Sequence, residues 1–211
     1  MMLSMNFLYR SLPCEAISMR EVAIFAEDFA HQAVLDALLS RIGSDLDVQV
    51  KPIWRNARRG HGAVVREFAQ FQRDILRGAH QPDLIVVATD ANCKGYNKRR
   101  SEIPAHAAAG PQVIFAIPDP HIERWLLLDS AAFKKVFGQG CDAPDQKCER
   151  DRYKRLLIEN IHRSGRRPNL GGIEFAADIV GAMDLDRAAR SDPSLGRFIG
   201  DLRTAFGRWQ E

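Results

Sequence analysis

The stretch DLIVVAT, Asp83 to Thr89, decides the fold, and Asp90 follows it directly. Its apolar side chains would fall on both faces of a strand, which is typical of a central parallel strand covered by helices on either side. Asp90 adds a charge at the point where this strand ends. We therefore expect a buried central strand with an acidic residue at its carboxyl end.

A strand-loop-helix unit is predicted upstream. The segment EVAIFA, residues 21–26, is a short run of strand formers that stops at Glu27 and Asp28. Apolar residues then follow a helical period over residues 30–42, and Gly43 is a suitable helix stop. The first strand, like the central one, is thus expected to end on acidic residues.

A second unit lies between these two strands. DVQVKPIW, residues 47–54, alternates like a strand, and Pro52 indicates a strand at or near an edge of the sheet. A basic loop over residues 55–62 leads to a helix expected over residues 63–77, which has one apolar face.

The chain continues with another strand, QVIFAIP, residues 112–118, which ends on Asp119. A less regular segment over residues 103–109 is expected to be helical, and residues 122–128 read as the opening of a further helix. Alternating strands and helices indicate an α/β fold, with a parallel sheet of about four strands and helices on both faces.

The last third of the sequence is predicted to be helical elaboration, with helices over residues 149–161, 173–183 and 194–208. We expect one α/β domain over residues 19–211, with its core at about 20–130 and the helical part at about 149–208, after an extension of residues 1–18. A chain of 211 residues is long enough for one sizeable core.

Composition narrows the class of protein. An apolar fraction of 45%, a formal charge of +3 and a pI near 8.8 are those of an ordinary globular protein that could bind a polyanion. No apolar run approaches the roughly 20 residues of a membrane span, so we expect no membrane contact. The cysteines indicate a reducing compartment, and we expect a cytoplasmic protein. The four cysteines lie far apart without a secretory leader, which predicts free thiols, no disulfide and no zinc site; they are Cys14, Cys93, Cys141 and Cys148.

Acidic and amide side chains follow three of the predicted strands. Ligands of parallel sheets bind at the carboxyl ends of the strands, and gathered carboxylates usually need a divalent cation. Oxygen ligands without a His or Cys set favour Mg²⁺ or Mn²⁺. Each acid taken alone could equally be a helix N-cap. The side chains are Glu27, Asp28, Asp90, Asn92, Asp119 and Glu123.

Three segments, VAIFAEDFAHQAVL, LIVVATDANCKG and VIFAIPDPHIERWLLLD, together resemble the Toprim domain. They span roughly residues 20–129, and the likeness is greatest to compact nucleases related to the overcoming-lysogenisation-defect family. The resemblance implies a Toprim- or Rossmann-like sheet and a metal-dependent nuclease, as in anti-phage defence systems whose ATPase is a separate protein. It implies catalytic roles for Glu27, Asp90 and Glu123, and Mg²⁺ or Mn²⁺ ligands in Glu27, Asp90, Asn92 and Asp119.

Two positions depart from the family pattern. Asp28 stands where the family commonly has Gly, and Asn92 stands where it commonly has a second aspartate. Because an amide brings no charge, these departures leave open an inactive module that binds nucleic acid, a nucleotide or a partner ATPase. A small-molecule phosphotransfer or hydrolase domain is a third, fainter alternative.

Basic residues flank the acids in sequence. Such residues beside a metal site suit the phosphate backbone of DNA or RNA, although they could equally be solvated loop charges. Asp28, His121 and Lys154 are further candidates for the site, whereas His31 is read as a packing or capping residue. The basic residues are Arg55, Arg58, Arg59, Lys94, Lys98, Arg99 and Arg100.

Overall fold

The computed structural model describes residues 19–56, 60–104 and 110–210. Its centre is a four-stranded parallel sheet with strand order β2-β1-β3-β4. The α/β fold predicted from the sequence is therefore confirmed, and so is the edge position of the Pro52 strand. The strands are β1 (Arg20–Ala26), β2 (Val50–Asn56), β3 (Leu84–Ala88) and β4 (Gln112–Ala116).

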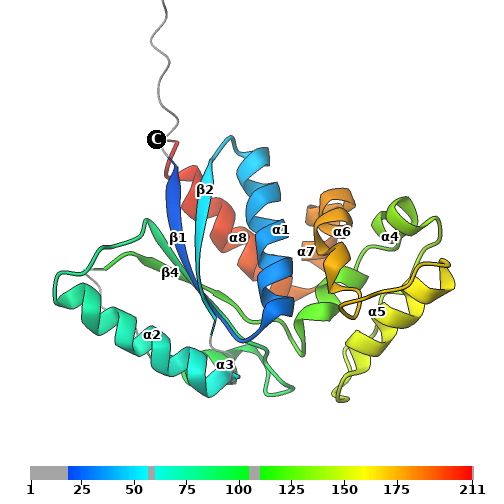
Figure 1. Ribbon diagram of the computed structural model, residues 1–211, viewed down its shortest axis with the longest axis horizontal. Coiled ribbons are helices and arrows are strands. Elements are labelled where there is room, and N and C mark those ends of the chain that lie inside the picture. Colours follow the sequence, from blue (N-terminus) through cyan, green and yellow to red (C-terminus); the bar gives the residue numbers. More distant parts are fainter. Residues whose placement is uncertain (1–18, 57–59, 105–109, 211) are drawn as a thin grey trace, which may run out of the picture.

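Helices cover both faces of the sheet (Figure 1). The first half of the chain contributes α1 (Phe29–Asp45), α2 (His61–Leu76) and α3 (Tyr96–Ser101). The second half contributes the 3₁₀ helix η1 (Ile122–Leu127), α4 (Ser130–Phe137), α5 (Arg152–Arg163), the 3₁₀ helix η2 (Ile173–Phe175), α6 (Ala176–Ala182), α7 (Leu185–Ser191) and α8 (Pro193–Gly207).

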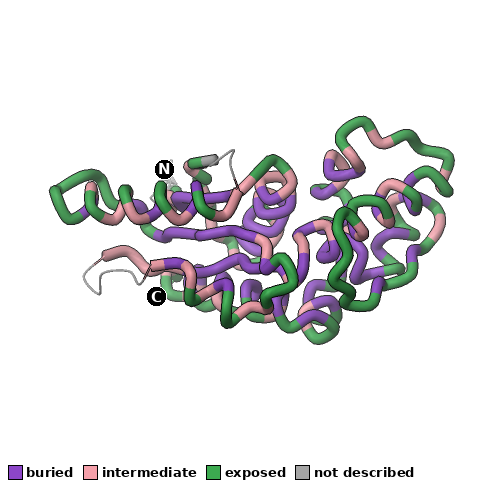
Figure 2. Tube along the Cα trace, turned by 90° about the horizontal axis from the view of Figure 1, so that it is seen from below, coloured by how far each residue is buried: buried purple, intermediate pink, exposed green. Residues whose placement is uncertain are grey.

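The strands separate two apolar clusters because successive side chains point to opposite faces. Ile24 of β1 belongs to the cluster with α1, α6 and α8, whereas Phe25 belongs to the cluster with α2. Figure 2 shows the strands as a buried layer. β1 and β3 lie inside the sheet and are covered on both sides, which explains why β3 and residues 22–26 of β1 are apolar throughout.

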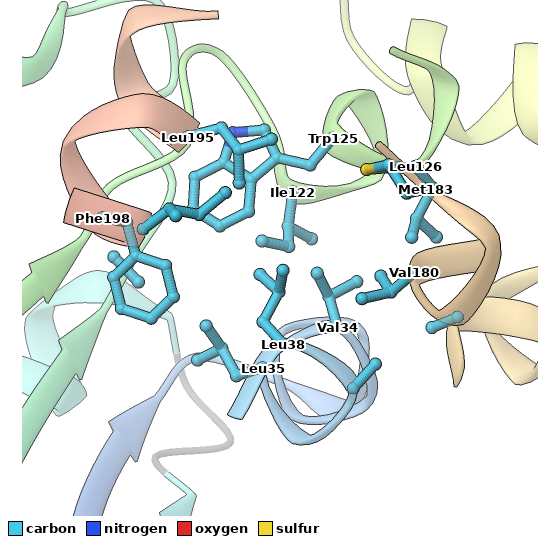
Figure 3. Packing of buried hydrophobic residues seen from close by; sticks show 14 of the residues in the cluster. Val34, Leu35, Leu38, Ile122, Trp125, Leu126, Val180, Met183, Leu195 and Phe198 are labelled. Carbon is cyan, nitrogen blue, oxygen red and sulfur yellow. The ribbon is translucent and has the colours of Figure 1, made fainter. Parts of the chain in front are cut away.

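Two of the C-terminal helices, α6 and α8, pack with α1 on one face of the sheet. Figure 3 shows Leu38 of α1 facing Ile122 and Trp125 of η1, with Phe198 of α8 and Val180 of α6 beside them. Trp125 and Phe198 stack with ring centroids 5.9 Å apart. The final third of the chain therefore holds η1, and with it the loop after β4, against the start of α1.

Gly43 does not end α1, contrary to the sequence-based expectation. The helix runs to Asp45, and a Cβ on Gly43 would lie 2.7 Å from the Val48 carbonyl oxygen. The glycine is therefore needed because the chain turns back closely into β2, and not because it caps the helix.

The segment after β3 also differs from the prediction. A helix forms at Tyr96–Ser101, and residues 105–109 of the helix expected at 103–109 lie outside the described residues. Residues 122–127 form a 3₁₀ helix instead of opening an α-helix. The helix α4, which begins directly after its N-cap Asp129, was not predicted as a separate helix.

A disulfide joins Cys93 to Cys148, with Cα atoms 5.5 Å apart, so the prediction of free thiols was wrong for this pair. The prediction failed because 55 residues separate the two in sequence and only the tertiary fold brings them together. Cys141 is free and buried. In the described part of the chain, every helix is too short or too polar to cross a bilayer.

Candidate active site

Three adjacent strands end at one edge of the sheet. Ala26 of β1 pairs with Ala88 of β3, and Ala88 pairs with Ala116 of β4. Glu27 follows the first of these alanines directly, and Asp90 comes two residues after the second. The strand order therefore brings acids from distant parts of the sequence to the same edge, as the sequence predicted.

Asp90 lies at the centre of the site, with a side chain that is only 15% exposed. One oxygen, Oδ1, accepts from the Ile122 backbone N–H at 2.9 Å and lies 3.3 Å from His31 Nε2. The other, Oδ2, lies 3.2 Å from His121 Nδ1. Burial opposes ionisation, but the two histidines outweigh it and hold the pKa of Asp90 below its usual value.

His31 is fully buried and bridges two carboxylates. Its Nδ1 lies 2.9 Å from Asp28 Oδ1, and its backbone N–H donates to the same oxygen at 3.1 Å, which makes Asp28 the N-cap of α1. Burial disfavours the imidazolium, yet Asp90 and Asp28 together raise the pKa of His31 well above its usual value. Partial burial would raise the pKa of Asp28, but its hydrogen bonds to His31 and the charge of that ring outweigh burial and lower the pKa to about 2.

Glu27 and Glu123 are partly buried beside Asp90. Burial raises the pKa of Glu27, and the negative charge of Asp90 adds to this, while a hydrogen bond from Thr89 and the charge of His31 oppose it. Burial likewise raises the pKa of Glu123, and Asp90 again adds to the shift. Three carboxyl groups thus interact electrostatically at this edge, and His31 supplies part of the compensating charge.

A series of polar side-chain contacts connects Glu27 to the start of α2. Thr89 donates to Glu27 and also lies 3.0 Å, through Oγ1, from Nδ1 of His61, the first residue of α2. His61 Nε2 faces Glu102 Oε2 at 3.2 Å. Burial and the nearby Arg99 guanidinium lower the pKa of His61, so its neutral form is favoured. Sequence reasoning missed His61, although its place between Gly60 and Gly62 after a strand was an available signal.

The other two residues expected to hold a metal, Asn92 and Asp119, have surroundings of their own. Asn92 is exposed, with its backbone in the left-handed region at φ 47°, and its N–H donates to the Pro120 carbonyl. Asp119 lines a separate small pocket with Tyr96 and Arg197. The carboxyl edge of the sheet therefore divides into an acidic centre around Asp90 and a neighbouring pocket.

The basic residues predicted to follow Asp90 differ in their exposure to solvent. Lys94 and Lys98 are exposed, and Lys94 pairs with Glu102. Arg99 is buried, pairing with Glu102 and donating to the Ala91 carbonyl, so it does not face solvent. The Arg100 guanidinium lies 3.8 Å from the centre of the Phe115 ring.

The other basic candidates lie farther from Asp90 in the sequence. Arg55 is on β2, with its guanidinium over the Phe71 ring, and Arg58 and Arg59 fall outside the described residues. Lys154 is exposed on α5 and approaches Gly171. Beside it on α5, the buried Tyr153 has its ring 6.2 Å from that of His121.

The donor chemistry at Asp90 fits a hard divalent cation. Glu27, Asp90 and Glu123 offer only oxygen atoms, and two of the three carry a raised pKa that a cation would relieve. Within the described residues, no three His, Cys, Asp or Glu side chains are already arranged around a common metal position. Binding at this centre would therefore require the two carboxyl groups of Glu27 and Glu123 to reorient toward Asp90.

A family model matches residues 26–203, and this family is described as a domain of unknown function, DUF4276. The chain belongs to the DUF4276 family. No curated protein and no solved structure matched the chain. The matched range of the DUF4276 domain includes Glu27, Asp90 and Glu123 as well as the C-terminal helices as far as residue 203 in α8.

Proposed function

We propose that this DUF4276 protein is a Mg²⁺- or Mn²⁺-dependent phosphodiesterase that cleaves DNA or RNA, with a Toprim-like site. One observation supports the proposal above all: Glu27, Asp90 and Glu123 come from three separate segments and share one partly buried edge of the sheet. Carboxylates gathered in this way interact unfavourably unless a cation joins them.

The roles follow from the contacts. Glu27, Asp90 and Glu123 would hold the cation, which when bound polarises a phosphodiester and activates water. His121 is held by Asp90 through Nδ1, and its other ring nitrogen would donate a proton to the leaving oxygen. Thr89, which lies against His61, donates to one oxygen of Glu27, Oε1, and the Glu27 carboxyl would turn toward Asp90 when the cation binds.

Exposed lysines provide the contact with the polyanion in this proposal. Lys94 and Lys98 follow Asp90 in the loop and the short helix α3, so they flank the acidic centre. Cytoplasmic action on nucleic acid, together with a separate ATPase partner in a defence system, belongs to the same proposal and derives from the Toprim resemblance.

Cleavage assays test the proposal directly. Plasmid, single-stranded DNA and RNA would be incubated with pure protein in Mn²⁺, Mg²⁺ or EDTA. We expect metal-dependent cleavage that Glu27→Gln and Asp90→Asn abolish. Glu21→Gln is the matched control, since Glu21 lies on the same strand at the opposite end, where it pairs with Lys51 and His80. Wild-type protein that cleaves none of the substrates in either metal would refute the proposal.

A binding module without catalysis is the second candidate. It is favoured by the buried His31, whose charge already compensates Asp90 and Asp28 without a metal. This candidate predicts nucleic-acid binding of equal strength in Mn²⁺ and in EDTA, measured by fluorescence anisotropy, with no cleavage. Metal-dependent cleavage that disappears in the Asp90→Asn protein would exclude it.

A further inference from the structure

A pocket of about 220 Å³ lies beside the acidic centre. It opens between the loop after β4, the start of α3, the segment before α5 and the start of α8. Asp119, which lines it, precedes Ile122 by three residues, and the Ile122 N–H donates to Asp90. The cavity is smaller than the roughly 300–1,000 Å³ of common ligand pockets, which suits a single ring system better than a whole nucleotide.

The pocket is lined by carboxylates as well as by one guanidinium, that of Arg197. Asp192 and Asp119 both line it. The buried Asp192 is already engaged by Arg124, by the Ser194 hydroxyl and by the Leu195 N–H. Asp119 is held through its backbone N–H, which donates to Ser194 Oγ at 3.3 Å. Asp119 also brings a carboxylate to the lining of the pocket. Carboxylates accept from the exocyclic amino group of a base such as cytosine.

A planar cation forms another wall. The Arg197 guanidinium lies 4.2 Å from the centre of the Tyr96 ring, and Tyr96 in turn packs on the apolar cluster around α2. Guanidinium planes backed by an aromatic ring are surfaces on which nucleic-acid bases stack. Gln146, with one amide donor group and one acceptor, completes the polar lining.

The disulfide ties the two sides of the pocket together. Cys93 comes three residues before Tyr96, and Cys148 comes two residues after Gln146. A cross-link at this place holds the walls at a fixed separation before any ligand arrives, which reduces the ordering cost of binding.

We propose that this pocket binds an amino-bearing nucleobase, stacked on Arg197 and paired with Asp119, next to the phosphodiester at Asp90. The inference deepens the proposed function, because it makes the substrate single-stranded nucleic acid with an unpaired base beside the cleaved bond. Bases of a duplex could not enter unless they left the stack.

Binding measured in EDTA separates this inference from cleavage. Isothermal titration calorimetry would use CMP and UMP, together with hexanucleotides of cytidine and of uridine. We expect the cytosine ligands to bind more tightly than the uracil ligands. A preference seen with hexanucleotides but absent with mononucleotides would identify the base of a strand as the ligand, whereas tight CMP binding would identify a free nucleotide.

The decisive variant is Arg197→Lys, which keeps the charge and removes the planar group. We expect its affinity for cytosine ligands to fall about two- to thirty-fold, while Arg203→Lys on the same helix, which pairs with Asp186, changes nothing. Tyr96→Leu should weaken binding in the same direction.

Three results would overturn the inference: no binding of any ligand, equal affinity for cytosine and uracil, or full affinity in Arg197→Lys with loss only in Arg197→Ala, which would indicate a phosphate contact. Cytosine-selective binding without cleavage in Mn²⁺ would instead support the base-binding pocket and refute the proposed nuclease activity.

Discussion

Reduction of the Cys93–Cys148 disulfide should destabilise the protein substantially. The bond closes a loop of 55 residues in the unfolded chain. In the chain-entropy model, a loop of that length corresponds to about 4 kcal/mol of unfolding free energy at 25 °C. For a chain of this size each kcal/mol corresponds to about 2–4 °C in the melting temperature, so reduction should lower Tm by about 8–16 °C.

Thermal unfolding followed by circular dichroism, with and without a phosphine reductant, measures this effect. The Cys93→Ser protein should melt at the temperature of the reduced wild type, and its melting temperature should not change when reductant is added. Cys141→Ser is the matched control and should keep the full reductant dependence, since Cys141 is free. Mass spectrometry after alkylation of unfolded protein should detect two additional modified cysteines once the protein is reduced. Equal melting temperatures with and without reductant would refute the reasoning.

Asp192→Ala should lower the free energy of unfolding in urea by about 3–5 kcal/mol, because it leaves the buried Arg124 without its partner; a loss below about 1 kcal/mol would contradict this reading. Asp129→Asn should destabilise at neutral pH and progressively less in acid. Burial opposes ionisation of Asp129, but N–H groups of Asp184 and Ala132 and the Arg187 guanidinium bind its carboxylate and lower its pKa. Its contribution is therefore present above the ordinary value of 3.8 and lost as the pH falls below it. Unfolding measured from pH 7 to pH 2 checks the sign, with the exposed Asp178→Asn as control; a difference from wild type that stays constant over this range would contradict it.

Local sequence signals predicted the sheet well. The apolar run at β3 predicted burial on both faces, and Pro52 indicated that β2 lies at an edge of the sheet. Both features depend only on residues near each other in sequence. The boundaries that failed depend on tertiary contacts. Gly43 looks like a helix stop in the sequence, but the structure shows that it is needed because the Val48 carbonyl oxygen packs closely against it.

The site was predictable in part for the same reason. The common location of Asp90 and Glu27 could be predicted because strand ends of a parallel sheet share an edge. The residues that contact these two carboxylates could not be predicted. His31 looks like a packing residue on α1, and only the fold shows that its ring joins Asp28 to Asp90. The pairing of Cys93 with Cys148, and the Arg197–Tyr96 contact, span too much sequence for any local pattern to indicate.

Titration of the protein with Mn²⁺, followed by electron paramagnetic resonance of the free ion, tests the shared acidic centre most directly. Wild-type protein and the Glu21→Gln control should remove Mn²⁺ from solution to the same extent, and Asp90→Asn should fail to do so. Wild-type protein that binds no Mn²⁺, or Asp90→Asn protein that binds it as tightly as wild type, would contradict a cation site at this edge of the sheet.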